Sequence, residues 1–180
     1  FNGQAGHALA RIGEPAVEPL LEAAASGSGL RSLRSIDVLG EMGAVASRRS
    51  IPALVAAFKQ GNPDIKSRAA TALSKCGRSA VPDLIQLLRD RTGGGLISKA
   101  LGDIGPDAKD AIPTLLETIA ETAPYGDTTA AHAIGQIGGV SALVKSLDVE
   151  AARFSVLQAL TGKGPAAQEA MPKLVHILKT

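Results

Sequence analysis

The chain has 180 residues, of which 45% are hydrophobic and only 2% aromatic, and its formal net charge is +2. No apolar run approaches the roughly 20 residues that a transmembrane helix needs, and the start lacks the basic and hydrophobic regions of a signal peptide. The cytoplasm is therefore the default expectation, and the single cysteine excludes an internal disulfide framework. With so few aromatic side chains, we expect a core of Ala, Leu, Ile and Val between closely approaching helices.

Residues 1–60 are predicted to form two helix pairs. The first pair has a short first helix near the start of the chain and a second helix over 14–26, followed by a glycine-rich turn at 27–29. In the second pair, about 30–60, the first helix ends at Gly43. Ile51-Pro52 is expected to open the second helix, because proline is tolerated in a first turn. The loop between these two helices is therefore predicted to be longer than in the third pair.

Residues 62–90 form the clearest helix pair. Asn62-Pro63-Asp64 has the capping side chain, the first-turn proline and the acidic residue of a helix start. Apolar residues then recur at helical spacing up to Gly77, a residue suited to end a helix. Val81-Pro82 opens the second helix. Each helix has one apolar side only, so the pair cannot enclose a core and must stack on neighbours.

Three further pairs are predicted in the second half of the chain. The pair at about 92–122 begins with glycines at 93–95, which should shorten its first helix. The pair at about 124–148 is the most degenerate, with a short second helix at about 140–147. In the last pair, about 149–180, Met171-Pro172 opens the second helix and no polar capping helix follows.

A short motif repeats in the first helices. The motif is Ala, then Leu or Ile, then Gly four residues later, and it occurs six times if Val38 is accepted in place of Ala. Its Leu or Ile stands at positions 9, 39, 73, 101, 134 and 160. The spacings are 30, 34, 28, 33 and 26 residues, and repeats of this length with two helices each indicate a solenoid. We therefore expect Leu73 and Leu101 to be buried between neighbouring pairs.

A known repeat pattern fits Asp64, Ile65, Lys66, Ala69, Ala70, Ala72, Leu73 and Gly77 in the third pair and Ala152, Arg153, Ala159 and Leu160 in the last pair. Over nearly its whole length, the chain resembles the HEAT-repeat family, in particular the short bacterial repeats described in phycobilin lyases. The resemblance implies an all-α fold, a right-handed α-solenoid of about six stacked antiparallel helix pairs, with second helices lining the inner curve. We expect residues 1–180 to be a single domain of this kind. Because the chain opens within a first helix and without Met, we also expect it to be a fragment of a longer protein.

No group of residues predicts catalysis or a cofactor. His7 and His132 share a repeat position that is polar in every pair, so both are expected on an outer helix surface. His176 lies on a second helix, where a binding role is an alternative, and it has no nearby second metal ligand. Cys76 shares its position with Ile or Met in four other pairs and is expected to be buried and unreactive. We therefore expect no enzyme activity, no cofactor and no metal.

Charge is unevenly distributed and leaves two alternative functions open. Residues 31–91 carry eleven Lys/Arg and five Asp/Glu, a net charge of +6, whereas 103–127 carry six acids and one lysine, a net −5. The basic segment makes weak binding to a nucleic-acid backbone one alternative, which a steep salt dependence would identify. The family resemblance makes a bilin-lyase-type or lyase-accessory subunit the other, which a shifted tetrapyrrole absorption band would identify.

The favoured function is a protein–protein interaction scaffold that binds another protein or peptide segment on its concave face. In the third pair, Val81, Leu84 and Leu88 are expected to face the stack, so the side chains between them face away. Carrying these positions along the repeats predicts one continuous strip, shallow at Ala53 and Ala56. Its charged and polar members are Glu22, Lys59, Asp83, Gln86, Arg89, Thr114, Glu117, Lys145, Lys173, His176 and Lys179. Its acidic start predicts an extended or helical partner whose basic end lies toward Glu22. Nucleic acid, membrane and metal are not expected partners.

Overall fold

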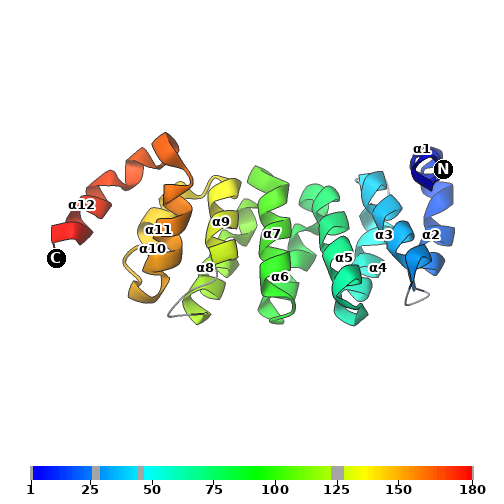
Figure 1. Ribbon diagram of the computed structural model, residues 1–180, viewed down its shortest axis with the longest axis horizontal. Helices are drawn as coiled ribbons and strands as arrows, with labels where there is room; N and C mark the ends of the chain where they lie inside the picture. The colour runs from blue at the N-terminus through cyan, green and yellow to red at the C-terminus, as the bar shows by residue number, and fades with distance from the viewer. Residues whose placement is uncertain (1, 26–28, 44–46, 123–127, 180) are drawn as a thin grey trace. The chain divides into compact units, whose positions relative to one another are not determined.

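The structure is a computed structural model that describes residues 2–25, 29–43, 47–122 and 128–179 (Figure 1). Every regular element in these ranges is a helix, so the all-α fold class predicted from the sequence is confirmed. The chain divides into two compact units, residues 1–84 and 85–180. Among the described helices, none is long and apolar enough to span a bilayer.

The first unit consists of α-helices and short 3-10 helices. Its elements are α1 (Asn2–Ile12), the 3-10 helix η1 (Glu14–Ala16), α2 (Val17–Ala25), α3 (Leu30–Met42), α4 (Ser47–Gln60), α5 (Pro63–Lys75), η3 (Gly77–Ala80) and α6 (Val81–Arg89), which crosses the unit boundary. Asn62 caps α5 as predicted, because its Oδ1 accepts a hydrogen bond from the Ile65 amide at 3.0 Å. Gly77 follows α5 with a φ of 61°, a conformation that glycine adopts without steric cost.

α4 begins earlier than the sequence predicts. The helix starts at Ser47, so Pro52 lies inside it and does not open it. The prediction of a loop up to Ile51 is therefore wrong, although residues 44–46 lie outside the described part of the chain. A proline inside a helix costs one backbone hydrogen bond, because proline has no N–H to donate. Ile51 is 6% exposed, and the burial of this apolar side chain helps to offset that cost.

The second unit also consists of α-helices and 3-10 helices. Its elements are α7 (Gly94–Ile104), η4 (Gly105–Ala111), α8 (Ile112–Glu121), α9 (Thr128–Ile137), α10 (Val140–Ser146), η5 (Glu150–Ala152), α11 (Arg153–Thr161), η6 (Gly164–Ala170) and α12 (Met171–Lys179). α7 has 11 residues against 13 in α5, in line with the shortening expected from the glycines at 93–95. α10 has 7 residues, which confirms the short second helix predicted near 140–147.

Within each unit, a second helix packs on the first helix of the following pair. α2 contacts α3 and α4 contacts α5 in the first unit, while α8 contacts α9 and α10 contacts α11 in the second. First helices also lie side by side, as Figure 1 shows for α3 with α5 and for α7 with α9. Leu73 and Leu101 are both 0% exposed, so the predicted burial of these two positions is confirmed.

The close approach of first helices depends on small side chains. A Cβ atom placed on Gly40 of α3 would lie 2.8 Å from the Cα of Ala72 on α5. In the second unit, a Cβ on Gly102 of α7 would lie 3.1 Å from the Cα of Ala133 on α9. Each of these glycines directly follows the leucine of the repeated motif. The motif therefore places a small residue where neighbouring first helices meet, as the nearly aromatic-free composition suggested.

Candidate functional site

The second helices of the first unit enclose an apolar groove. It lies between α2 and α4 and has a volume of about 320 Å³. Its lining consists of small, aliphatic and amide residues, namely Leu21, Ala24, Ala25, Ala53, Ala56, Ala57, Gln60, Gly61 and Ile65. Positions 53, 56 and 57 share one side of α4 because of the helical period. A shallow surface was predicted at Ala53 and Ala56, and both residues line this groove.

Charged residues lie beside the groove. Glu22 on α2 and Lys59 on α4 are exposed. Glu22 directly follows the lining residue Leu21, and Lys59 directly precedes the lining residue Gln60. The carboxylate of Glu18 on α2 lies 4.0 Å from the guanidinium of Arg49 on α4, with both side chains more than half exposed. Such an exposed ion pair contributes little to stability. Charged side chains therefore lie at the exposed edge of the apolar groove.

The predicted strip residues of α6 are accessible to different degrees. Asp83 is half-buried, whereas Gln86 and Arg89 are exposed. The Gln86 Nε2 donates a hydrogen bond to Asp90 Oδ1 at 2.8 Å, so this amide lies along the surface of its own helix. Of the three predicted residues on α6, Arg89 is therefore the one that is both charged and exposed.

Thr114 does not belong to the exposed surface. It is 4% exposed, so the prediction that it faces away from the packed helices is wrong. α8 contacts η5 as well as α9. Glu117, nearly one turn further along α8, is exposed as predicted.

The remaining predicted residues lie on α10 and α12. Lys145, His176 and Lys179 are exposed. Lys173 is half-buried and forms an ion pair with Asp148, which lies just beyond the end of α10. The charge of Lys173 is thus partly compensated within the chain, so it contributes less to a partner surface than Lys145 and Lys179.

A second groove, which sequence reasoning missed, lies on first helices of the second unit. It has a volume of about 470 Å³ and is lined by Lys99, Asp103, Thr128, Thr129, His132, Gln136, Gln158 and Ala159. Lys99 Nζ and Asp103 Oδ2 form an ion pair at 2.7 Å. His132, Lys99 and Gln158 are exposed, as their shared polar position predicted. The shared repeat position predicted that these side chains are exposed. It could not predict the groove, because a periodic pattern within one helix does not give the distance between neighbouring helices.

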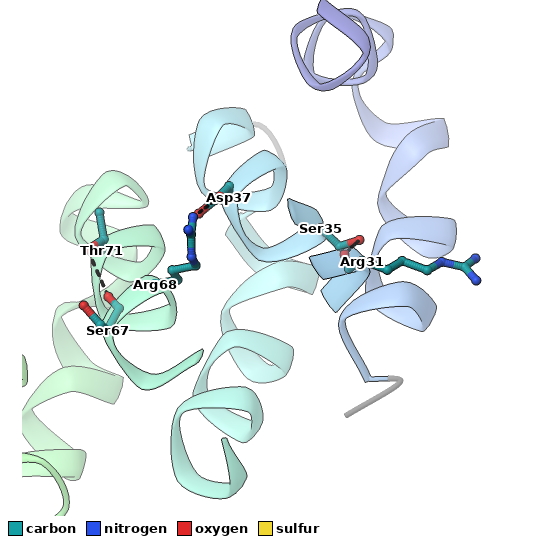
Figure 2. Close-up of polar contacts among 6 residues, drawn as sticks. All are labelled: Arg31, Ser35, Asp37, Ser67, Arg68 and Thr71. Atoms are coloured by element: carbon teal, nitrogen blue, oxygen red, sulfur yellow. Dashed lines mark hydrogen bonds and ion pairs between the residues drawn. The ribbon is translucent and has the colours of Figure 1, made fainter. Parts of the chain in front are cut away.

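Two arginines of the basic segment 31–91 differ in whether they pair within the chain. Arg68 on α5 forms an ion pair with Asp37 on α3, while Arg31 on α3 extends away from this pair (Figure 2). Figure 2 also shows two hydroxyl groups bonded within their own helices, from Ser35 to the Arg31 carbonyl and from Thr71 to the Ser67 carbonyl, each at 3.0 Å. Arg68 is therefore engaged within the chain, and only Arg31 of the two arginines in this view points freely outward.

In the described part of the chain, no three His, Cys, Asp or Glu side chains gather as metal ligands. Cys76 is 3% exposed, and burial raises the pKa of its thiol, while a hydrogen bond with the Ser50 side chain opposes that shift. A raised pKa disfavours the nucleophilic thiolate.

We expect native Cys76 to react with a thiol reagent only when the protein opens locally. The rate of colour release from a chromogenic disulfide at neutral pH measures this directly, in buffer and in urea. Ser79→Cys, at an exposed position only three residues away, is the matched control and should react at once. Equal rates for Cys76 and the introduced cysteine would contradict the burial of Cys76.

These two grooves differ in their lining and in the helices that form them. One is apolar and lies on second helices of the first unit, and the other is polar and lies on first helices of the second unit. Ala53 and Ala56 of the predicted strip line the apolar groove, whereas no predicted strip residue lines the polar one. A scan against protein-family models and a search of curated proteins find no match for this chain, so its own geometry carries the functional argument.

Proposed function

We propose that the chain is a protein-interaction scaffold of the HEAT-like α-solenoid class, which binds a helical or extended segment of another protein along the exposed faces of its second helices. The six copies of the motif support this fold class. The packing of second helices on the following first helices within each unit supports it as well. Repetition of one helix pair produces a long and uniform surface, which suits a linear partner.

The alanine-lined groove between α2 and α4 is the observation that carries the proposal. Its five alanines leave space that longer side chains would fill. An amphipathic helix can place its apolar face into such a groove. Each partner Leu, Ile or Met side chain that becomes fully buried contributes about 1.5–3 kcal/mol. Of the lining side chains, only Gln60 is polar, so the groove is suited to apolar contact.

The flanking charges give the proposed partner a direction. Glu22 is exposed on α2 and attracts a basic residue of the partner. Charges at the edge of an interface affect orientation and association rate more than affinity. In the second unit, Glu117, Lys145, His176 and Lys179 are the exposed residues at the corresponding positions of second helices, and Thr114 is excluded because it is buried.

The test uses peptides selected from a displayed library against the intact chain. Ala56→Leu fills the groove and is expected to weaken binding of the selected peptides at least about tenfold, or about 1.4 kcal/mol. Glu22→Lys is expected to slow their association. Affinities and rates are measured by surface plasmon resonance at two salt concentrations, because exposed charges are screened by salt.

Two matched variants serve as controls. Thr71→Leu adds a leucine to the exposed surface of the first helix α5, and Arg34→Glu reverses a charge on the first helix α3. Both should leave peptide binding unchanged. If these first-helix variants abolish binding while Ala56→Leu does not, the partner surface lies on the first helices and the proposal is wrong.

A further inference from the structure

The polar groove on α7, α9 and α11 is lined by side chains with unused hydrogen-bonding capacity. His132, Gln136 and Gln158 line it and are exposed. No hydrogen bond or ion pair joins any of these three side chains to another residue in the described part of the chain. Each glutamine amide offers donors and an acceptor, and a neutral imidazole offers one of each. The groove can therefore both donate and accept hydrogen bonds from two neighbouring helices.

The Gln136 amide extends from α9 toward α7. A side chain at Gly102 of α7 would collide with Gln136 Oε1, so the glycine leaves the space that this amide occupies. His132 lies one turn before Gln136, on the same side of α9. Lys99 and Asp103 of α7 line the groove as well and form an ion pair at 2.7 Å. The described lining thus combines donors and acceptors without a net charge.

Phe154 adds an exposed aromatic ring beside the groove. It lies one turn before the lining residue Gln158, on the same side of α11, and it is 57% exposed. The fold does not require an apolar residue there, because the same repeat position holds Ser67, Gly95 and Thr128 in the three preceding first helices. Thr128 is exposed although α7 and α11 both contact α9. Exposure at this position therefore does not come from a missing neighbour.

The chemistry of the lining favours one class of ligand. Of the described lining residues, only Ala159 is apolar, so the groove lacks the apolar pockets that hold the side chains of a bound peptide. Its one lysine, Lys99, is already paired with Asp103, so a phosphate backbone gains little there. Sugar hydroxyls, in contrast, both donate and accept hydrogen bonds. The C–H groups of a sugar ring can also lie against the face of an aromatic ring, which carries partial negative charge.

We therefore propose that the polar groove binds a neutral oligosaccharide. The sugar hydroxyls form hydrogen bonds with His132, Gln136 and Gln158, and one sugar ring stacks on Phe154. The volume of about 470 Å³ falls within the range of about 300–1,000 Å³ that small-molecule sites have. Binding is weak, because each hydrogen bond to the sugar replaces one to water. The site is separate from the alanine-lined groove and does not depend on the proposed peptide binding.

Nuclear magnetic resonance titration of the intact chain tests this site. The probes are maltotriose, cellotriose, mannotriose and triacetylchitotriose, each added up to about 10 mM, which is ten times a Kd of about 1 mM. At least one probe should shift the side-chain amide signals of Gln136 and Gln158. Saturation of the Phe154 ring protons should transfer to the C–H protons of the same probe. Because the ligand is uncharged, added salt should leave the Kd unchanged.

Two variants assign the contact, and two more serve as matched controls. Phe154→Ser should raise the Kd about five- to tenfold through loss of the ring contact, and Gln158→Ala about three- to tenfold through loss of a hydrogen bond. Met171→Ser removes an apolar side chain that is 55% exposed outside this groove. Gln86→Ala removes an exposed glutamine from the second helix α6. Both controls should keep the Kd of the parent chain. Because all four residues are exposed, all four variants should keep its helical circular dichroism.

Three outcomes overturn the proposal. The groove is not a saccharide site if none of the four probes shifts the Gln136 and Gln158 signals. The sugar binds elsewhere if the control variants weaken binding as much as Phe154→Ser does. The groove takes another class of ligand if the selected peptides or a single-stranded oligonucleotide shift these signals and the saccharides do not. Ala56→Leu should weaken peptide binding and leave saccharide binding unchanged, so the failure of one proposal is distinguishable from that of the other.

Discussion

Truncation of Leu73 or Leu101 to alanine is expected to lower the free energy of unfolding by about 2–5 kcal/mol. Both side chains are 0% exposed, and both lie on first helices that pack against neighbouring first helices, α5 on α3 and α7 on α9. The loss has two parts, the transfer free energy of the removed atoms and the cost of the cavity that remains. Urea denaturation followed by circular dichroism measures it.

The two leucines also report on different parts of the chain. Leu73 belongs to the unit of residues 1–84 and Leu101 to the unit of residues 85–180. If the units unfold in separate transitions, each substitution should lower only the midpoint of its own unit. Leu30→Ala, at a position that is 68% exposed, is the control and should be close to neutral. Near-neutral effects at both buried positions would contradict their place in the core.

Gly40→Ala is expected to destabilise the first unit by about 1–3 kcal/mol, although alanine is normally favoured over glycine inside a helix by up to about 1 kcal/mol. The added Cβ would lie 2.8 Å from both the Cα and the Cβ of Ala72. These atoms cannot rotate away as the end of a flexible side chain could. α3 and α5 would have to separate, and the contacts along their length would weaken. Thermal and urea unfolding measure the net effect.

Gly95→Ala is the matched control for this prediction. Its Cβ would meet only Thr129 Oγ1, at an ordinary distance of 3.8 Å, and Gly95 lies in the helix α7. The same substitution should therefore raise stability slightly, through helix propensity alone. A stabilising effect of both substitutions would mean that α3 and α5 tolerate a wider separation than the structure has.

The sequence predicted the features of the fold that depend on local rules. Asn62 and Gly77 mark the ends of α5 because capping and positive φ act within a few residues. Leu73 and Leu101 are buried because the 3.6-residue period and the repeated motif fix their direction. The exposure of His132 and the burial of Cys76 follow from the same comparison of motif positions.

The features that sequence analysis missed depend on contacts between elements. Pro52 was expected to open a helix, yet packing of Ile51 allows α4 to start before it. Thr114 was expected to be exposed, yet it is buried in the packing around α8, which contacts both α9 and η5. The polar groove around Lys99 and His132 depends on the distance between helices, which no single-helix pattern contains.

The packing of each second helix on the helix that follows it has a consequence for synthesis on the ribosome. α2 leaves the ribosome before α3, and α8 before α9, so the apolar side of each second helix is made before the element that covers it. At about 5–20 residues per second, the covering helix arrives after a delay on the order of one to a few seconds. Helix formation itself takes about a microsecond. Folding should therefore advance one element behind translation, and the most recently made second helix should be the segment that chaperones bind in the nascent chain.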